Sequence, residues 1–297
     1  MAGALAAGSL TLSACDASPY AASVNGYTIS QLSLNNQLKQ WSSNRTWVAS
    51  FDSANSQQNG GSGATVAGSG GANTYSSTFV ADILDNMIQV RIIHQRLAAT
   101  GKLPTADEVV ASRAVNEFLR ANYWAEFPSS LRQFLVEQLA EQAPLTPVSS
   151  DTATLKSAYS QITPYLFSSV CVISASAFDQ ARAQSLASGG NLTGAPVCFS
   201  QTDFEDQPAA LQKAVQKLSV GQTSSPIPTS FGYQVVKLVS RQSPGFTEGV
   251  QRVLSVATAS SVAPSVTALI KSAHVKVNPA YGTWSNGRIS TPQLSSS

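Results

Sequence analysis

The stretch SSPIPTSFGYQVVKL, residues 224–238, decides the fold of this chain. Its first half is rich in serine and proline, which favour turns. Its second half carries Tyr233, Val235 and Val236 around Gln234, and aromatic and β-branched residues favour strands. We therefore predict a turn, a short strand and then a long strand, which together close a sheet.

Upstream of this stretch, strand and helix patterns alternate. LFSSVCVIS (166–174) predicts a strand, and the segment 176–190 predicts a helix that two glycines end. APVCFS (195–200) predicts a second strand, and QPAALQKAVQKL (207–218) a second helix. The predicted order from about 165 to 241 is therefore β-α-β-α-β-β.

The segments on either side are mainly helical. Ala22-Ser23-Val24 predicts a short strand and Asn25-Gly26 a turn, and several helices follow from about residue 30 to residue 163. Residues about 50–77 are rich in glycine, serine and asparagine, so we expect a disordered loop there. After residue 243 we expect a helix, a strand at His274–Val277 and a polar tail.

The N-terminal segment points to export. Residues 1–14 are small or apolar and carry no charge, and they end in Leu12-Ser13-Ala14 before Cys15. This pattern resembles the lipobox of bacterial lipoproteins, which implies a signal peptide and a lipidated Cys15. A signal needs a basic first region, so we expect the true start upstream of Met1. An ordinary tail of small residues is the alternative.

Charge and cysteine content narrow the possibilities. Only 11% of the 297 residues are charged and the net charge is +2, so the chain lacks the basic surface that nucleic acid requires. If Cys15 is lipidated, Cys171 and Cys198 remain. An even number of cysteines in an oxidising compartment favours one disulfide, with two buried free thiols as the alternative.

Residues 165–241 resemble the parvulin-type peptidyl-prolyl isomerases. The motifs are VCVISAS (170–176), FSQTDFED (199–206) and the long run LSVGQTSSPIPTSFGYQVVKL (218–238). The flanks SVNGYTIS and AHVKVNPAYGTW resemble the SurA and PrsA class of exported foldases, particularly their actinobacterial lipoprotein relatives.

The resemblance implies an α+β fold with a helical SurA-type chaperone domain. The C-terminal segment would complete that domain, so that Ser23–Val24 pairs with Val275–Val277. A parvulin-like antiparallel four-stranded sheet with helices would be inserted between the two. The implied boundaries are a signal peptide at 1–14, the helical domain at 15–163, the parvulin-like domain at 164–242, and the returning segment at 243–297 with a disordered tail.

The same resemblance implies an altered site. Cys171 and Gln234 stand at the family's two histidine positions, and the chain's only histidines, His94 and His274, lie outside this region. The implied peptide-binding residues are Phe204, Leu211, Phe231 and Gln234, although the three apolar ones could be ordinary core and Gln234 a spacer. Because the family's first two strands are neighbours, a disulfide between Cys171 and Cys198 would lie on the floor of the site.

The expected function is therefore a chaperone or foldase that binds unfolded exported proteins, with weak or lost isomerase activity. We expect it to be lipid-anchored on the outer face of the cytoplasmic membrane, without cofactor, metal or nucleic acid. An active peptidyl-prolyl isomerase is the first alternative, and a structural envelope lipoprotein is the second.

Overall fold

The computed structural model describes residues 20–58, 65–68, 74–189 and 191–291. In it, two segments that are far apart in the sequence meet in one small sheet. Strand β1 (Tyr20–Val24) lies between β2 (Tyr27–Ser30) and β7 (Val275–Val277). Ala22 pairs with Val277 and Val24 with Val275. The predicted pairing of Ser23–Val24 with Val275–Val277 is therefore confirmed. The proposed signal peptide and Cys15 lie outside the described residues.

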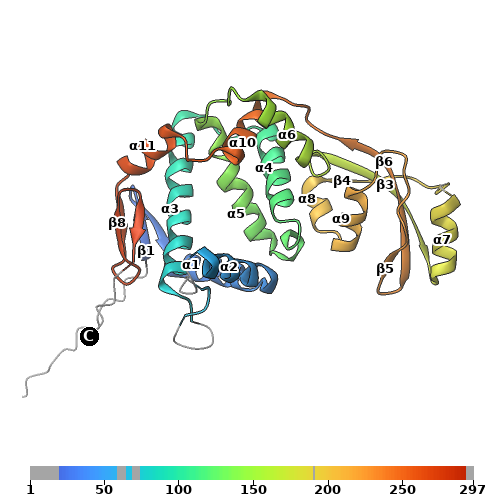
Figure 1. Cartoon of the computed structure of the whole chain (residues 1–297), viewed down its shortest axis with the longest axis horizontal. Coiled ribbons are helices and arrows are strands. Elements are labelled where there is room, and N and C mark those ends of the chain that lie inside the picture. Colours follow the sequence, from blue (N-terminus) through green and yellow to red (C-terminus); the bar gives the residue numbers. More distant parts are fainter. Residues whose placement is uncertain (1–19, 59–64, 69–73, 190, 292–297) are drawn as a thin grey trace, which may run out of the picture.

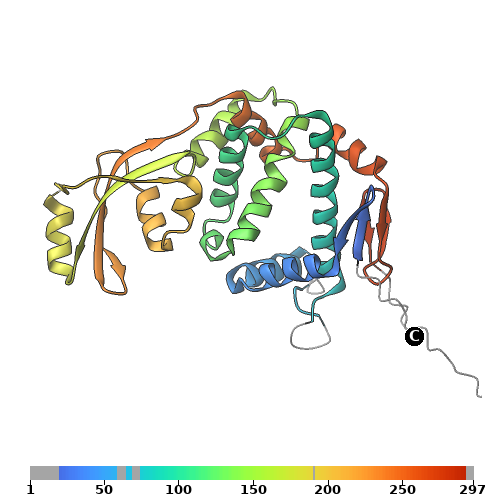
Figure 2. The ribbon, with the colours of Figure 1, turned by 180° about the vertical axis from the view of Figure 1, so that it is seen from behind.

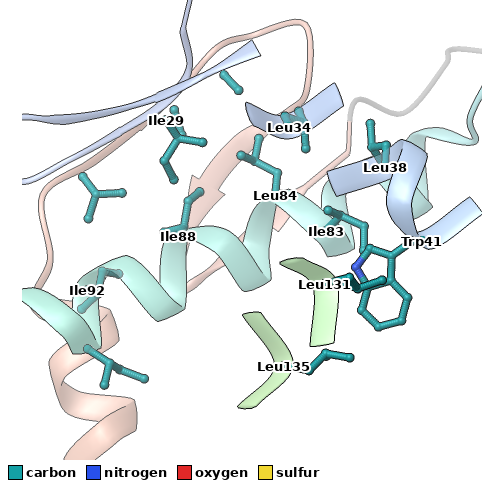
Figure 3. Packing of buried hydrophobic residues seen from close by; sticks show 14 of the residues in the cluster. Ile29, Leu34, Leu38, Trp41, Ile83, Leu84, Ile88, Ile92, Leu131 and Leu135 are labelled. Carbon is teal, nitrogen blue, oxygen red and sulfur yellow. The ribbon is translucent and has the colours of Figure 1, made fainter. Parts of the chain in front are cut away.

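Helices form the larger of the two parts of the molecule, the helical body (Figure 1). Their amphipathic patterns place apolar side chains on α3, the longest helix, against α1 and α5 (Figure 3). Ser76 caps the start of α3, and Gly101, with φ of 65°, ends it. The elements are α1 (Gln31–Ser42), α2 (Arg45–Gln58), α3 (Ser77–Thr100), α4 (Ala106–Leu119), the 3-10 turn η1 (Trp124–Glu126), α5 (Ser129–Ala140), the turn η2 (Ala143–Leu145) and α6 (Thr152–Ile162).

The predicted disordered loop at about 50–77 is partly wrong. Helix α2 continues to Gln58, and the ring of Phe51 lies against those of Trp47 and Phe79. Val66 is buried, and its N–H donates to Asp52. The glycine- and serine-rich composition masked a short apolar helix face, whose burial stabilises this segment. Residues 59–64 and 69–73 lie outside the described residues.

The C-terminal segment returns to the helical body with more structure than predicted. Helix α10 (Glu248–Thr258) packs on α4 and α6, and α11 (Pro264–Ser272) packs on α3. The expected polar tail instead forms a hairpin of β8 (Thr283–Ser285) and β9 (Arg288–Ser290). Trp284 and Ile289 pack against the core of the helical body, which explains why this short hairpin is held in place.

The smaller part, which we call the sheet part, has a four-stranded antiparallel sheet of order β4-β3-β6-β5, as predicted. Helices α8 and α9 cover one face, the α9 face, and α7 covers the other, the α7 face. Figures 1 and 2 both show α8 and α9 between the strands and the helical body. The elements are β3 (Ser169–Ala177), α7 (Gln180–Gly189), β4 (Val197–Ser200), α8 (Gln201–Glu205), α9 (Ala209–Gln216), β5 (Ile227–Thr229) and β6 (Gly232–Gln242).

A buried charge cluster joins the two parts. The carboxylate of Glu205, at the end of α8, forms an ion pair with Arg113 of α4 and accepts a hydrogen bond from the Trp124 indole at 3.3 Å. Arg132 of α5 lies 3.5 Å from the same carboxylate and donates to the main-chain oxygen of Glu205 at 3.1 Å. All of these groups are buried. A buried charge is tolerated only when it is paired and hydrogen-bonded, so this cluster specifies how the parts fit.

Glu117 of α4 lies beside this cluster and is also buried. Burial, and then the charge of Glu205, raise the pKa of the Glu117 carboxyl to about 8. Gln216 of α9 donates a hydrogen bond to it. A carboxyl whose pKa is raised on folding stabilises the fold fully below its unfolded value of 4.5, and this stabilisation is lost as the pH rises toward 8.

We predict that Glu117→Gln makes the protein less sensitive to alkaline pH. The amide keeps an acceptor for Gln216 but never ionises, so its advantage over the wild type should grow from pH 4.5 to 8 and then level off. Urea unfolding at pH 5, 6.5 and 8 measures this. Glu137→Gln, which removes an exposed carboxylate from α5, is the control. An equal pH dependence in Glu117→Gln and the wild type would contradict the prediction.

Candidate functional site

The two residues at the expected histidine positions lie on neighbouring strands but not side by side. Cys171 on β3 is opposite Ser240 of β6, whereas Gln234 on β6 is opposite Ser176 of β3. Ser176 lies five positions after Cys171 on β3, which corresponds to roughly 16 Å along the strand. The expectation that they adjoin is therefore wrong.

The two side chains also belong to opposite faces of the sheet. Directly opposite residues share a face, and successive residues alternate between faces. Ser176, the partner of Gln234, lies five positions after Cys171 on the same strand, and an odd interval reverses the face. Gln234 therefore belongs to the α9 face and Cys171 to the α7 face. They cannot act together on one peptide bond.

The cysteines form a directly opposed pair across β3 and β4. Cys171 pairs with Cys198 in the register, and their sulfur atoms lie 2.03 Å apart, at bonding distance. The position differs from the expected one, because the pair lies on the α7 face and not beneath Gln234. That the two thiols are oxidised to a disulfide in the protein remains a prediction.

We predict that this disulfide forms and stabilises the protein. It would close a loop with a sequence separation of 27 residues, and constraining the unfolded chain in this way is worth about 3 kcal/mol. Cys198→Ser should lower the free energy of unfolding by about this amount, and reductant should do the same to the wild type. A non-reduced digest should yield peptides linked through Cys171 and Cys198. Finding both thiols free by mass spectrometry would refute the bond.

Two of the four expected peptide-binding residues are part of the core. Phe204 is 1% exposed and Leu211 is 6% exposed. The ring of Phe204 contacts Phe167 edge-on, with centroids 5.4 Å apart, and Leu211 packs in the same cluster. These side chains have almost no free surface for a proline ring, which favours their structural interpretation.

The other two lie near the far end of the sheet. Phe231, in the turn between β5 and β6, is 89% exposed. Gln234 is half-buried and opposite both Ser176 and Ile227. The structure therefore does not gather the four residues into one pocket. A role in binding remains a prediction for Phe231 and Gln234.

We predict that truncation of Phe204 lowers the stability of the protein strongly, whereas truncation of Phe231 hardly changes it. Phe204→Ala leaves a cavity in the core and should cost about 3–5 kcal/mol of unfolding free energy. Phe231→Ala removes an exposed ring and should change it by less than about 0.5 kcal/mol. Urea titrations of both variants test this, and an unchanged stability in Phe204→Ala would show that its ring is not a core element.

Both histidines make structural contacts in the helical body. The Nδ1 atom of His94, on α3, lies 2.5 Å from Glu141, whose pKa is raised mainly by burial. His274 precedes β7, and its backbone N–H donates to the side-chain oxygen Oδ1 of Asn25. Neither belongs to the sheet part, as the sequence interpretation expected.

Phe178, an exposed residue near the sheet, was not identified from the sequence as a candidate site residue. Phe178 directly follows β3 and is 93% exposed. Ala177 pairs with Tyr233, which brings Phe178 next to Gly232 and hence close to Phe231. The sequence pattern had assigned Phe178 to a helix, so its position beside the turn at Phe231 was not foreseen.

Comparisons with known proteins give remote structural matches. No family model and no curated protein matches the chain. Solved structures similar to it include a SurA-like chaperone from Campylobacter jejuni, at 11% identity and a TM-score of 0.23, which covers 88% of this chain and 99% of its own.

Two PrsA structures are similar in the same way. The PrsA peptidylprolyl isomerase from Bacillus cereus is 15% identical, with a TM-score of 0.24, over 87% of this chain and 93% of its own. The foldase protein PrsA from Lactococcus lactis is 16% identical, with a TM-score of 0.28, over 88% and 95%. Superpositions this loose assign no role to any residue here, so roles are assigned from this chain's own geometry.

The described residues also bear on membrane attachment. None of their helices combines the length and the apolar character that a bilayer-spanning segment requires.

Proposed function

We propose that this protein is a folding factor of the cell envelope that binds unfolded exported polypeptides, and that its sheet part has little or no prolyl isomerase activity. The proposed lack of isomerase activity is supported by the placement of Cys171 and Gln234 on opposite faces of the sheet. The proposed role as a folding factor is supported by the motifs of residues 165–241 and by the return of the C-terminal segment to β1.

The chemistry of isomerisation explains why this placement matters. The barrier of about 18–20 kcal/mol comes from the partial double bond of the peptide link, and no covalent bond has to break. An enzyme must bind the twisted amide better than the planar forms. This requires an apolar pocket and a hydrogen-bond donor on one surface. Phe204 and Leu211 are core residues, so Gln234 would have to act without the pocket expected beside it.

The location outside the cytoplasm is part of the proposal. The sequence Leu12-Ser13-Ala14-Cys15 supports a lipid anchor on the outer face of the cytoplasmic membrane. The opposed Cys171 and Cys198 suit an oxidising compartment. Labelling with a radioactive fatty acid in the host, compared between the wild type and Cys15→Ser, tests the anchor.

We predict chaperone activity without isomerase activity. The full chain should suppress the aggregation of a chemically denatured test protein at near-equimolar ratio. It should not accelerate a protease-coupled proline-peptide assay above background, with an active parvulin as the positive control. An inert globular protein at equal mass concentration controls for crowding.

The other outcomes point to the alternatives. Acceleration that is lost in Gln234→Ala would establish a working isomerase with an altered site. Failure to suppress aggregation and to bind any unfolded protein would instead favour a structural envelope lipoprotein.

A further inference from the structure

We infer that the second half of β3 is a binding site for an extended apolar segment, which adds to the sheet as a further strand beside β3. The nature of the ligand rests on the proposed function, since an unfolded exported chain would supply such segments. The site itself follows from the strand register, the hydrogen-bonding directions and the exposed aromatic residues at its end.

The first observation is that β3 is only half covered on its outer side. It runs from Ser169 to Ala177, and β6 pairs with its whole length. On the opposite side, β4 pairs only with residues 169–172. Residues 173–177 therefore form a free edge, with no strand beside them in the described part of the chain.

The second observation is the direction of the backbone groups along this edge. The main-chain groups of Val236 and Leu238 on β6 bond toward the β5 side. The N–H of Ser224 donates to the main-chain oxygen of Val236, and the N–H of Leu238 donates to the main-chain oxygen of Gln222. Their neighbours Val235 and Lys237 must then bond toward β3, where they meet Ala175 and Ile173. By alternation, the N–H and C=O groups of Ser174 and Ser176 point away from β6.

These four outward groups define the chemistry of the partner. Two residues that each offer an N–H and a C=O, spaced two apart, match the main chain of an added extended strand. A strand in line with β4 would run antiparallel to β3 and form a closely bonded pair with each serine. Folded proteins have already paired their backbone groups, so an unfolded segment is the fitting partner.

The third observation is an exposed aromatic pair at the end of the edge. Phe178 follows Ala177 and lies close to Gly232, and Phe231 directly precedes Gly232 in the turn between β5 and β6; both phenylalanines are exposed. No charged residue occurs in VISASAF (172–178) or FGYQVV (231–236). Two exposed aromatic side chains near an uncharged strand edge favour a ligand segment with apolar side chains.

The opposite edge of the sheet provides a contrast. Strand β5 is three residues long and carries Pro228, which has no N–H to donate. Short edge strands and prolines are the usual protection against unwanted pairing. Residues 173–177 have neither, nor an edge lysine, so this edge has remained open to a partner strand.

Binding of a designed peptide to the full chain tests the site. The probe is a fluorescent ten-residue peptide of alternating valine and threonine, together with two isomers N-methylated at every odd or every even amide. Because only one alternate set of amides faces β3, one isomer should bind about tenfold or more weakly and the other about as well as the parent. Equal affinity of both isomers would overturn the inference and indicate a merely apolar surface.

Two measurements on the protein complete the test. Hydrogen exchange should slow at the amides of Ser174 and Ser176 when the parent peptide binds, but not at Ile173 and Ala175, which already bond to β6. The double variant Phe178→Ala with Phe231→Ala should weaken binding several-fold. Leu103→Ala, which truncates an equally apolar, exposed side chain in the helical body, should not.

The test separates this inference from the proposed function. If the protein suppresses aggregation but the peptide neither binds nor protects Ser174 and Ser176, the strand-addition site is wrong and the chaperone function stands. If the peptide binds at β3 but aggregation is not suppressed, the site stands and the proposed function falls.

Discussion

The burial of one carboxylate, that of Glu205, determines how the two parts of this molecule are held together. An isolated carboxylate in such surroundings would cost many kcal/mol, and the cost is offset only because Arg113, Arg132 and the Trp124 indole converge on it from the helical body. Glu205 ends the short helix α8, which joins β4 to α9. A contact at this one residue therefore positions a strand on one side and a helix on the other. The neighbouring Glu117, held protonated by burial, adds a second link through Gln216.

With the sheet held in this way, its strand register decides what chemistry it can perform. Catalysis at a single peptide bond needs its groups on one surface, and a strand alternates its side chains between two. Cys171 and the partner of Gln234 are separated by an odd number of positions, so no change of side chain at 171 and 234 alone brings both groups to one face. Placing histidines at both positions would not rebuild a two-histidine site. The register of β3 against β6 thus keeps the side chains at positions 171 and 234 from acting on one surface.

The sequence predicted the features that depend on local pattern. The long strand around Gln234 was expected from its residues, whereas the pairing of Ser23–Val24 with Val275–Val277 and the neighbouring strands of the two cysteines were implied by the family resemblance. The register of β3 against β6 was not foreseen, because register belongs to two strands at once and a shift by one residue reverses every face. This is why Cys171 and Gln234 were expected to adjoin. Helix α2 and the β8–β9 hairpin were missed for another reason: a few apolar residues in polar surroundings, such as Phe51 and Trp284, are stabilised by packing that composition does not reveal.

The open edge of β3 has an identifiable cause in the sequence. Strand β4 begins at Val197, directly after Pro196, whose ring fixes φ at about −65°, a value that does not suit a regular antiparallel strand. The free half of β3 is thus a consequence of where β4 starts. An open edge carries a risk of self-association, and natural sheets usually place charge or proline on it. Here the outward positions hold two serines, and the adjoining loop and turn hold exposed phenylalanines. For a protein that only needed to be soluble this combination would be a liability, whereas for one that holds extended, unfolded segments it provides both the hydrogen bonds and the apolar contact that such segments require.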